Sequence, residues 1–243
     1  MNIICFGDSI THARAFAEGD RWPSIVQFEL NKWKDGQYAV YNRGQGGHTT
    51  AQGFDRLPDD VIPYLPGLLL VEFGLNDANV RDWARVPRVG LAEYEKNLRE
   101  FHRIAQAYNG QCVFIINHSI IERPNRQANG KTYYANSQPY DEALRRVAQE
   151  LNALSIDLPL MMQQRQIDLA RFVVEDGVHL TVEGNHLYAD VALEKLKDIL
   201  IRRICGTIKV IERVVTERSQ LDILVNSAGI IRNMSPESLR KSV

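Results

Sequence analysis

Four short segments of the chain carry side chains of the types that hydrolytic chemistry uses. Ser9 offers a hydroxyl group, Asn76 a carboxamide, and Asp176 and His179, three residues apart, a carboxylate and an imidazole. A serine hydroxyl attacks an ester only when a neutral imidazole takes its proton and a carboxylate holds that imidazole in the right tautomer. The oxyanion that then forms needs fixed hydrogen-bond donors. Together these residue types would suit ester hydrolysis.

Each segment by itself also has a simpler structural explanation. Ser9 would serve as a turn or helix-cap residue, the sequence around Asn76 as an ordinary turn, and Asp176 to His179 as a surface turn before a helix capped at or near Thr181. The glycine-rich stretch from Gly44 to Thr49 is neither a dinucleotide fingerprint nor a P-loop. Its glycines would, however, let another group approach backbone N–H groups closely. The occurrence of all four segments together favours the hydrolytic interpretation.

The hydrophobic pattern places these segments at the ends of predicted strands. Apolar runs predict strands near residues 2–6, 38–41, 68–73 and 113–116, with a weaker one at 154–158. Apolar residues at helical spacing predict helices at 22–33, 91–108, 140–151 and 189–200, the last ending near Arg203. This alternation predicts an α/β fold with a parallel sheet covered on both faces, which binds ligands at the carboxyl ends of its strands. The polar connection Ser119–Pro139 is long enough to be a functional loop.

A family resemblance emerges from the order of the four segments. FGDSIT, NRGQGGHT, FGLND and EDGVHLT, between residues 6 and 181, resemble the successive blocks of the SGNH (GDSL-type) hydrolases, with Ile10 where the GDSL name has leucine. The resemblance covers about the first 200 residues. It implies a three-layer α/β/α, flavodoxin-like doubly wound sheet of about five strands, acyl-ester hydrolysis, no metal and no cofactor.

The resemblance also implies roles for single residues. Ser9 would be the nucleophile, His179 the base and Asp176 its partner. The oxyanion hole would consist of the amide N–H groups of Ser9 and Gly47 and the side chain of Asn76. Gly47 is chosen because it precedes a polar–threonine pair, His48-Thr49. Gly44 and Gly46 are the alternative donors. Two flanking carboxylates, Asp8 and Asp77, are expected to support the site.

The expected substrate is a small ester with a short acyl group, chiefly acetyl, O-acetylated carbohydrates included. The polar loop Ser119–Pro139 would make a poor channel for a long acyl chain. Lysophospholipase, acyl-thioesterase and a catalytically inactive binding protein remain alternatives. Outside the triad, His12 and His48 are expected near the pocket, and His102 and His186 at the surface. Three aromatic residues would either face a sugar or pack in the protein: Trp83, Tyr133 and Tyr134.

Composition sets the broader limits. The 243-residue chain is 44% hydrophobic with a net charge of −1, which is typical of a soluble protein and argues against broad binding of nucleic acid or anionic membranes. No apolar stretch reaches about 18 residues and no signal peptide is evident, so we expect a cytoplasmic protein. Cys5 and Cys112 lie in apolar runs, as core thiols do. The sequence leaves the oligomeric state open, a homo-oligomer included.

The end of the chain does not fit the rest. We expect residues 1–204 to form the catalytic domain and residues 205–243 an appendage. Leu221–Gly229 resembles the strand and NNAG-type motif of short-chain dehydrogenases, which raises an NAD(P)-dependent oxidoreductase as a distant alternative. The chain has no glycine-rich first βα turn and no Tyr-x-x-x-Lys pair. We therefore expect the tail to be an appended remnant.

Overall fold

The computed structural model describes residues 1–218, 223–226 and 229–232, with side chains through residue 203. It contains two compact units, one formed by Asn2–Leu193 and one by Met1 and the chain from Glu194 onward. The long helix α10 (Val182–Arg218) is shared between them. The domain boundary expected after residue 204 stays a prediction.

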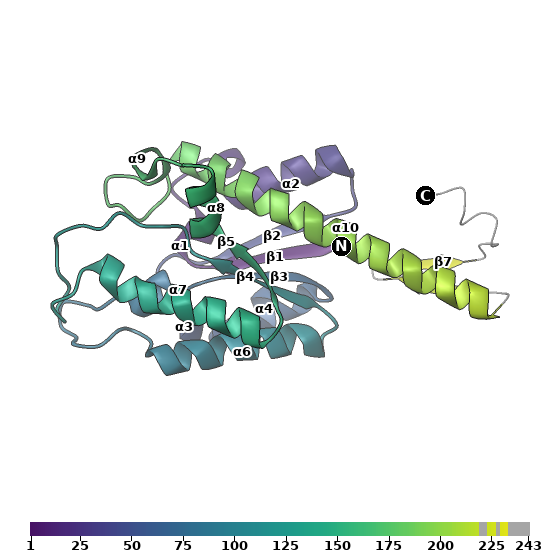
Figure 1. Ribbon diagram of the computed structural model, residues 1–243, viewed down its shortest axis with the longest axis horizontal. Helices are drawn as coiled ribbons and strands as arrows, with labels where there is room; N and C mark the ends of the chain where they lie inside the picture. The colour runs from purple at the N-terminus through teal and green to yellow at the C-terminus, as the bar shows by residue number, and fades with distance from the viewer. Residues whose placement is uncertain (219–222, 227–228, 233–243) are drawn as a thin grey trace. The chain divides into compact units, whose positions relative to one another are not determined.

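The first unit is built on a five-stranded parallel sheet (Figure 1). Its strands are β1 (Asn2–Gly7), β2 (Ala39–Gly44), β3 (Gly67–Glu72), β4 (Gln111–Ile116) and β5 (Leu154–Asp157), in the spatial order β2-β1-β3-β4-β5. This is the flavodoxin-like doubly wound order, so the predicted α/β class is confirmed. β2 extends past its predicted end to Gly44, because Asn42 and Arg43 continue the ladder with Cys5 and Phe6.

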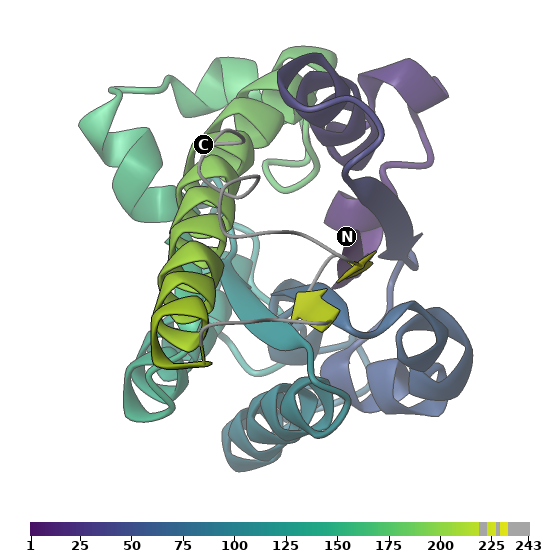
Figure 2. The same cartoon turned by 90° about the vertical axis from the view of Figure 1, so that its right-hand side faces the viewer.

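Helices cover both faces of the sheet (Figure 2). One face carries α3 (Thr50–Asp55), α4 (Leu57–Asp60), α6 (Leu91–Ala107) and α7 (Tyr133–Glu150), and the other carries α2 (Trp22–Trp33) and α8 (Leu158–Gln164). Trp22 of α2 packs on Tyr188 in the first turns of α10, with ring centroids 4.9 Å apart. The remaining short elements are α1 (Ser9–His12), η1 (Glu18–Asp20), η2 (Ile62–Tyr64), α5 (Leu75–Ala78) and α9 (Leu169–Phe172).

The core between the sheet and α6 is aromatic. Phe6 of β1 meets Phe73 and Phe101 edge to face, at centroid distances of 5.3 and 5.7 Å. Full burial of each such ring stabilises the fold by about 1.5–3 kcal/mol. The surface position predicted for His102 is wrong, because this residue follows Phe101 on the inward side of α6 and stacks on Phe114. Burial lowers the pKa of His102.

Two helix boundaries differ from the prediction. α7 begins at Tyr133 and contains Pro139, so the connection expected to reach Pro139 is shorter than predicted. The hydroxyl of Thr132 accepts a hydrogen bond from the Ala135 N–H at 3.1 Å and caps this earlier start. α10 passes the expected end near Arg203 and reaches Arg218. No proline interrupts it, and apolar residues continue at helical spacing: Ile204, Ile208, Ile211 and Val215.

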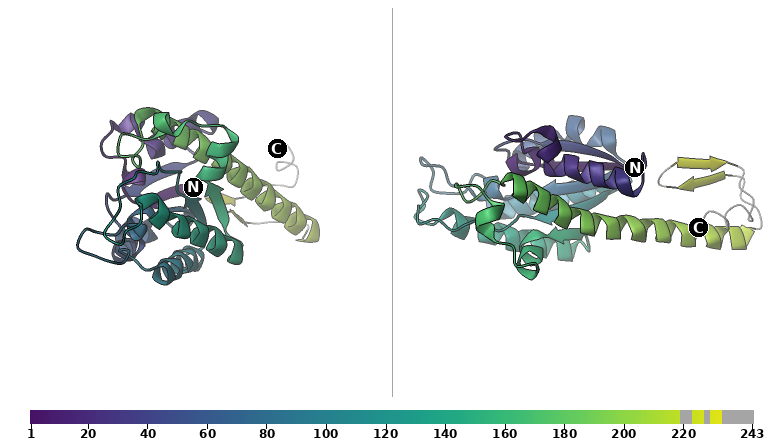
Figure 3. Two further views of the ribbon diagram at one scale, coloured as in Figure 1. Left: turned by 60° about the vertical axis from the view of Figure 1, so that its left-hand side comes forward. Right: turned by 90° about the horizontal axis from the view of Figure 1, so that it is seen from above.

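The tail contains two short strands, drawn in yellow in Figure 3. β6 (Ile223–Asn226), at the place of the strand expected there, pairs antiparallel with β7 (Gly229–Arg232). Within the dehydrogenase-like segment, residues 221–222 and 227–228 lie outside the described residues.

One buried carboxylate in α7 gives the fold a testable pH dependence. Burial raises the pKa of Asp141 to about 7, despite the opposing effect of Arg145. The pKa of an aspartate in the unfolded chain is about 3.9, so the folded state binds this proton more tightly. Wild-type stability is therefore lost as the pH rises from about 4 through about 7. We expect Asp141→Asn to gain melting temperature over the wild type across this interval and to keep that gain above it.

The matched control is Asp190→Asn, at an exposed position of α10. Its melting temperature should stay close to that of the wild type, because substitutions at exposed positions change stability little. A difference between Asp141→Asn and the wild type that does not change between pH 4 and pH 8 would contradict the prediction.

Candidate active site

The sheet topology brings the predicted catalytic segments to one edge. The chain leaves β1 toward β2 on one side and returns to β3 on the other, so the topological switch point lies between β1 and β3. Ligands of open α/β sheets bind at the carboxyl ends of the strands at this point. Ser9 follows β1, Gly47 follows β2 and Asn76 follows β3, so all three leave the same edge of the sheet.

Three of the predicted side chains form a continuous hydrogen-bonded chain. Ser9 Oγ lies 3.0 Å from His179 Nε2, and His179 Nδ1 lies 2.6 Å from Asp176 Oδ2. A proton on Nδ1 is donated to the carboxylate, which leaves the Nε2 lone pair as the acceptor for the Ser9 hydroxyl. About half of the His179 side chain, 51%, is exposed, so the imidazole is open to small reactants.

Asp176 also shapes the turn that carries His179. Its Oδ1 accepts hydrogen bonds from the N–H groups of Val178 at 2.7 Å and His179 at 2.9 Å. Partial burial acts to raise the pKa of Asp176, but the hydrogen bonds from the His179 ring and from the two amides outweigh it and lower that pKa. The carboxylate therefore stays ionised beside the imidazole.

The loop after β4 holds this turn in place. His118 donates from Nε2 to the Val178 carbonyl at 2.8 Å, and the Ile121 N–H donates to Gly177 O at 2.8 Å. Burial lowers the pKa of His118 to about 4, so its ring is neutral near pH 7. Sequence reasoning gave His118 no role in the site. Its position directly after β4, at the same sheet edge as Ser9, was the signal that could have found it.

The three candidate glycines, Gly44 at the end of β2 and Gly46 and Gly47 after it, differ in what their amides do. Gly44 N–H donates to Asn42 Oδ1 at 3.0 Å, and Gly46 N–H donates to His12 Nδ1 at 3.3 Å. The N–H of Gly47 has no hydrogen-bond partner among the described residues, and neither has that of Ser9. Both amides are therefore free to donate a hydrogen bond to a ligand, as the choice of Gly47 over Gly44 and Gly46 requires.

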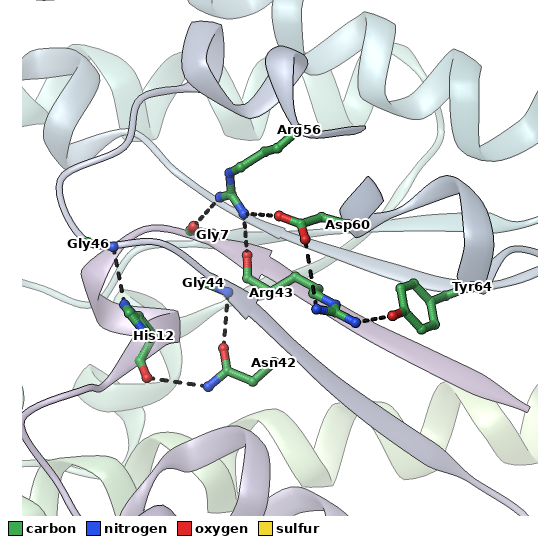
Figure 4. Close-up of polar contacts among 9 residues, drawn as sticks. All are labelled: Gly7, His12, Asn42, Arg43, Gly44, Gly46, Arg56, Asp60 and Tyr64. Atoms are coloured by element: carbon green, nitrogen blue, oxygen red, sulfur yellow. Dashed lines mark hydrogen bonds and ion pairs between the residues drawn. The ribbon is translucent and has the colours of Figure 1, made fainter. Parts of the chain in front are cut away.

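Arg56 anchors the loop before Gly47, as Figure 4 shows. The guanidinium of Arg56 donates to Gly7 O at 2.8 Å and to Arg43 O at 2.7 Å, so it ties the end of β1 to the end of β2. A Cβ atom on Gly44 would lie 2.1 Å from the His12 backbone nitrogen. Only glycine allows this close approach of the loop to α1. His12 thus lies beside the Gly46 amide, one turn after Ser9.

Asn76 is held by the carboxylate that precedes Ser9. Its Nδ2 donates to Asp8 Oδ2 at 2.9 Å, while Asp8 Oδ1 accepts from the Ile10 N–H at 2.9 Å. Beneath Asp8, the buried Glu72 accepts from the Thr11 hydroxyl at 2.8 Å. Burial and the nearby Asp8 carboxylate raise the pKa of Glu72 well above its usual value.

Asp77 supports the site from the other direction. Its carboxylate accepts hydrogen bonds from the N–H of Thr50, at 3.0 Å, and from the Thr50 hydroxyl. Burial raises its pKa to about 6 despite these bonds. Because Thr50 begins α3, Asp77 joins α5 to the helix that follows the Gly47 loop. Of the two residues expected to support the site, Asp8 thus contacts Asn76 and Asp77 contacts α3.

The described residues contain neither a cluster of metal ligands nor a membrane-spanning helix. No three histidine, cysteine, aspartate or glutamate side chains among them are grouped as metal ligands would be. None of the helices in the described part of the chain combines the length and the apolar character that crossing a membrane requires.

Comparisons with known proteins point to one group. Residues 5–187 match the model of the GDSL-like Lipase/Acylhydrolase family. The chain is 28% identical over 201 residues to an isoamyl acetate-hydrolyzing esterase 1 homolog of Bos taurus, covering 75% of this chain and 76% of the relative. Its fold is similar to a lipase/acylhydrolase from Enterococcus faecalis, with a TM-score of 0.67, 23% identity and coverage of 81% and 95%. It is also similar to the acetylxylan esterase Axe2 from Geobacillus stearothermophilus, with a TM-score of 0.64, 22% identity and coverage of 80% and 93%.

Proposed function

The chain belongs to the GDSL-like lipase/acylhydrolase family and is a carboxylic ester hydrolase, and from this premise we propose that it is a serine esterase acting through Ser9, His179 and Asp176. The observation that supports the proposal most directly is the hydrogen-bonded chain from Ser9 Oγ through the His179 ring to Asp176.

In the first half of the proposed reaction, Ser9 Oγ attacks the ester carbonyl carbon while His179 Nε2 takes the hydroxyl proton. The carbonyl oxygen becomes an oxyanion, which accepts hydrogen bonds from the amides of Ser9 and Gly47 and from Asn76 Nδ2. Asp176 stabilises the imidazolium that forms. The tetrahedral intermediate collapses when His179 returns its proton to the leaving alcohol, which leaves an acyl group on Ser9.

In the second half, water replaces the alcohol. His179 removes a proton from a water molecule, whose oxygen attacks the acyl carbon, and a second oxyanion forms in the same position. Return of the proton to Ser9 Oγ releases the carboxylic acid and restores the enzyme. The partial exposure of His179 suits this step, because water must reach Nε2.

We propose acetyl esters as the substrate class. The name of the isoamyl acetate-hydrolyzing relative and that of the acetylxylan esterase with a similar fold both refer to acetyl esters. Residues that follow β4 include the exposed polar side chains of Glu122, Arg123 and Arg126, which offer no apolar channel to a long acyl chain. Trp83 is 84% exposed, and such an indole can stack on a sugar ring. These features favour an O-acetylated carbohydrate among acetyl esters.

A substrate panel tests this proposal. We expect kcat/KM for p-nitrophenyl acetate to exceed that for p-nitrophenyl palmitate by at least about tenfold, since no apolar channel contributes binding energy to the longer chain. Acetylated xylo-oligosaccharides should release acetate, with Ser9→Ala as the blank. Faster hydrolysis of palmitoyl ester, lysophosphatidylcholine or palmitoyl-CoA would replace the acetyl-ester proposal with the lipase, lysophospholipase or thioesterase alternative.

A further inference from the structure

Arg88 contacts two residues of the candidate oxyanion hole, Gly47 and Asn76, and a third residue in α3. It lies between α5 and α6, and its Nη1 donates to Gly47 O at 2.8 Å and to Asn76 Oδ1 at 3.2 Å. Its Nη2 donates to Gln52 Oε1, in α3, at 3.0 Å. The Arg88 N–H donates to Asn79 O at 3.0 Å, so the backbone of this residue is tied to the end of α5.

These contacts decide which atom of Asn76 faces the reacting ester. A guanidinium only donates hydrogen bonds, so the side of the Asn76 amide that faces Arg88 must be the oxygen. The nitrogen then lies on the other side, where one of its hydrogens goes to Asp8 Oδ2 at 2.9 Å. Its second hydrogen remains for an oxyanion. Without Arg88 the amide loses one of the two partners that prevent it from turning over and presenting its oxygen.

Gly47 needs an anchor for a different reason. Its φ is +76°, and a Cβ atom built on it would have no heavy atom within 4 Å, so packing around this residue does not fix its backbone. A glycine in open space changes its backbone angles at little cost. The hydrogen bond from Arg88 to the Gly47 carbonyl therefore restricts the residue whose N–H is free to meet the oxyanion.

We propose that Arg88 is a positioning residue of the oxyanion hole, which orients the Asn76 side chain and the Gly47 backbone together. The inference rests on the proposed serine esterase function. Positioning of donors stabilises the transition state more than the bound substrate, so its loss lowers kcat with little effect on KM. A lysine at position 88 keeps the charge but cannot contact two oxygens with the fixed geometry of a guanidinium.

The test compares Arg88→Ala and Arg88→Lys with Arg85→Ala. Arg85 is an exposed arginine in the same loop that contacts the Ala128 carbonyl instead of the site. With p-nitrophenyl acetate, we expect kcat to fall about 10- to 100-fold in both Arg88 variants, less than the loss of a whole oxyanion donor. KM should stay within about threefold, and Arg85→Ala should match the wild type. Guanidinium chloride at a non-denaturing concentration should raise kcat of Arg88→Ala and leave Asn76→Ala unchanged.

A double-mutant cycle shows whether Arg88 acts through Asn76. If it does, Arg88→Ala costs less in an Asn76→Ala background than in the wild type, whereas independent residues give additive effects. Additive losses, a change in KM alone or a wild-type kcat in Arg88→Ala would each overturn the inference. If any of these results is found while Ser9→Ala is inactive, only the Arg88 inference fails and the serine esterase proposal stands. If Ser9→Ala is active, the serine esterase proposal itself fails. Guanidinium rescue keeps the test decisive if Arg88→Ala is less stable.

Discussion

Ser9→Ala is expected to lower kcat for ester hydrolysis by about 10⁶-fold, the loss typical of removing a triad nucleophile. The variant keeps the imidazole, the carboxylate and the donors but has no atom to carry the acyl group. Ser9 is only partly buried, and its hydroxyl contacts a half-exposed histidine, so the free energy of unfolding should change by about 1 kcal/mol or less. Stopped assays of p-nitrophenyl acetate hydrolysis and thermal melts measure the two quantities.

Covalent labelling gives an independent reading of the same prediction. A fluorophosphonate should add one phosphonyl group to Ser9 of the wild type and none to Ser9→Ala, as peptide mass spectrometry would show. Ser155→Ala, at an exposed position of β5, is the matched serine control and should keep full activity and labelling. Turnover by Ser9→Ala near the wild-type rate, or labelling at another residue, would end the triad proposal.

Asp176→Asn is expected to lower kcat by about 10³- to 10⁴-fold while the turn around it survives. The asparagine Oδ1 can still accept from the Val178 and His179 amides. Its NH₂ group would then face His179 Nδ1, which must accept and so lose its proton. The tautomer with hydrogen on Nε2 cannot take the proton of Ser9. The substitution thus leaves His179 in place but prevents it from accepting the Ser9 proton.

The pH profile separates this effect from general damage. In the wild type, kcat/KM should fall in acid as the imidazole of His179 becomes protonated, because a protonated ring cannot act as base. Asp176 does not cause this fall: partial burial would raise its pKa, but its hydrogen bonds with His179 and the Val178 amide lower that pKa overall. Asp176→Glu, which keeps the charge but moves it, should retain more activity than Asp176→Asn. An Asp176→Asn enzyme with near wild-type turnover would show that Asp176 only shapes the turn.

The strand-end positions of the site could be predicted because each depends on local sequence. The apolar runs that precede Ser9 and Asn76 define neighbouring strands, and parallel strands place their carboxyl ends at one edge. The start of α7 was harder, because Pro139 is a helix-breaking signal that the capped start at Thr132 overrides. His102 was assigned to the surface by residue type, although its place on α6 beside Phe101 is inward-facing.

The supporting residues could not be predicted, because they act across long sequence distances. In the sequence, Glu72 is a single polar residue in an apolar run. No nearby residue indicates that it will contact Asp8, which lies 64 residues away. Arg88 lies in a loop rich in arginine, and only the fold shows that it, and not Arg85, reaches Gly47 and Asn76. Such contacts follow from the packing of loops on the finished sheet.

The hydrogen bond between Ser9 and His179 joins residues 170 positions apart. During synthesis the proposed nucleophile, Ser9, is therefore made long before the proposed base, His179. At translation rates of 5–20 residues per second, the interval is roughly 10–30 s. Throughout it, the nascent chain carries β1 and Ser9 but lacks the imidazole of His179 that contacts the Ser9 hydroxyl in the finished fold. A chain arrested before Asp176 contains the residues of all five sheet strands but lacks two members of the proposed triad, so under the proposed mechanism it would not hydrolyse esters.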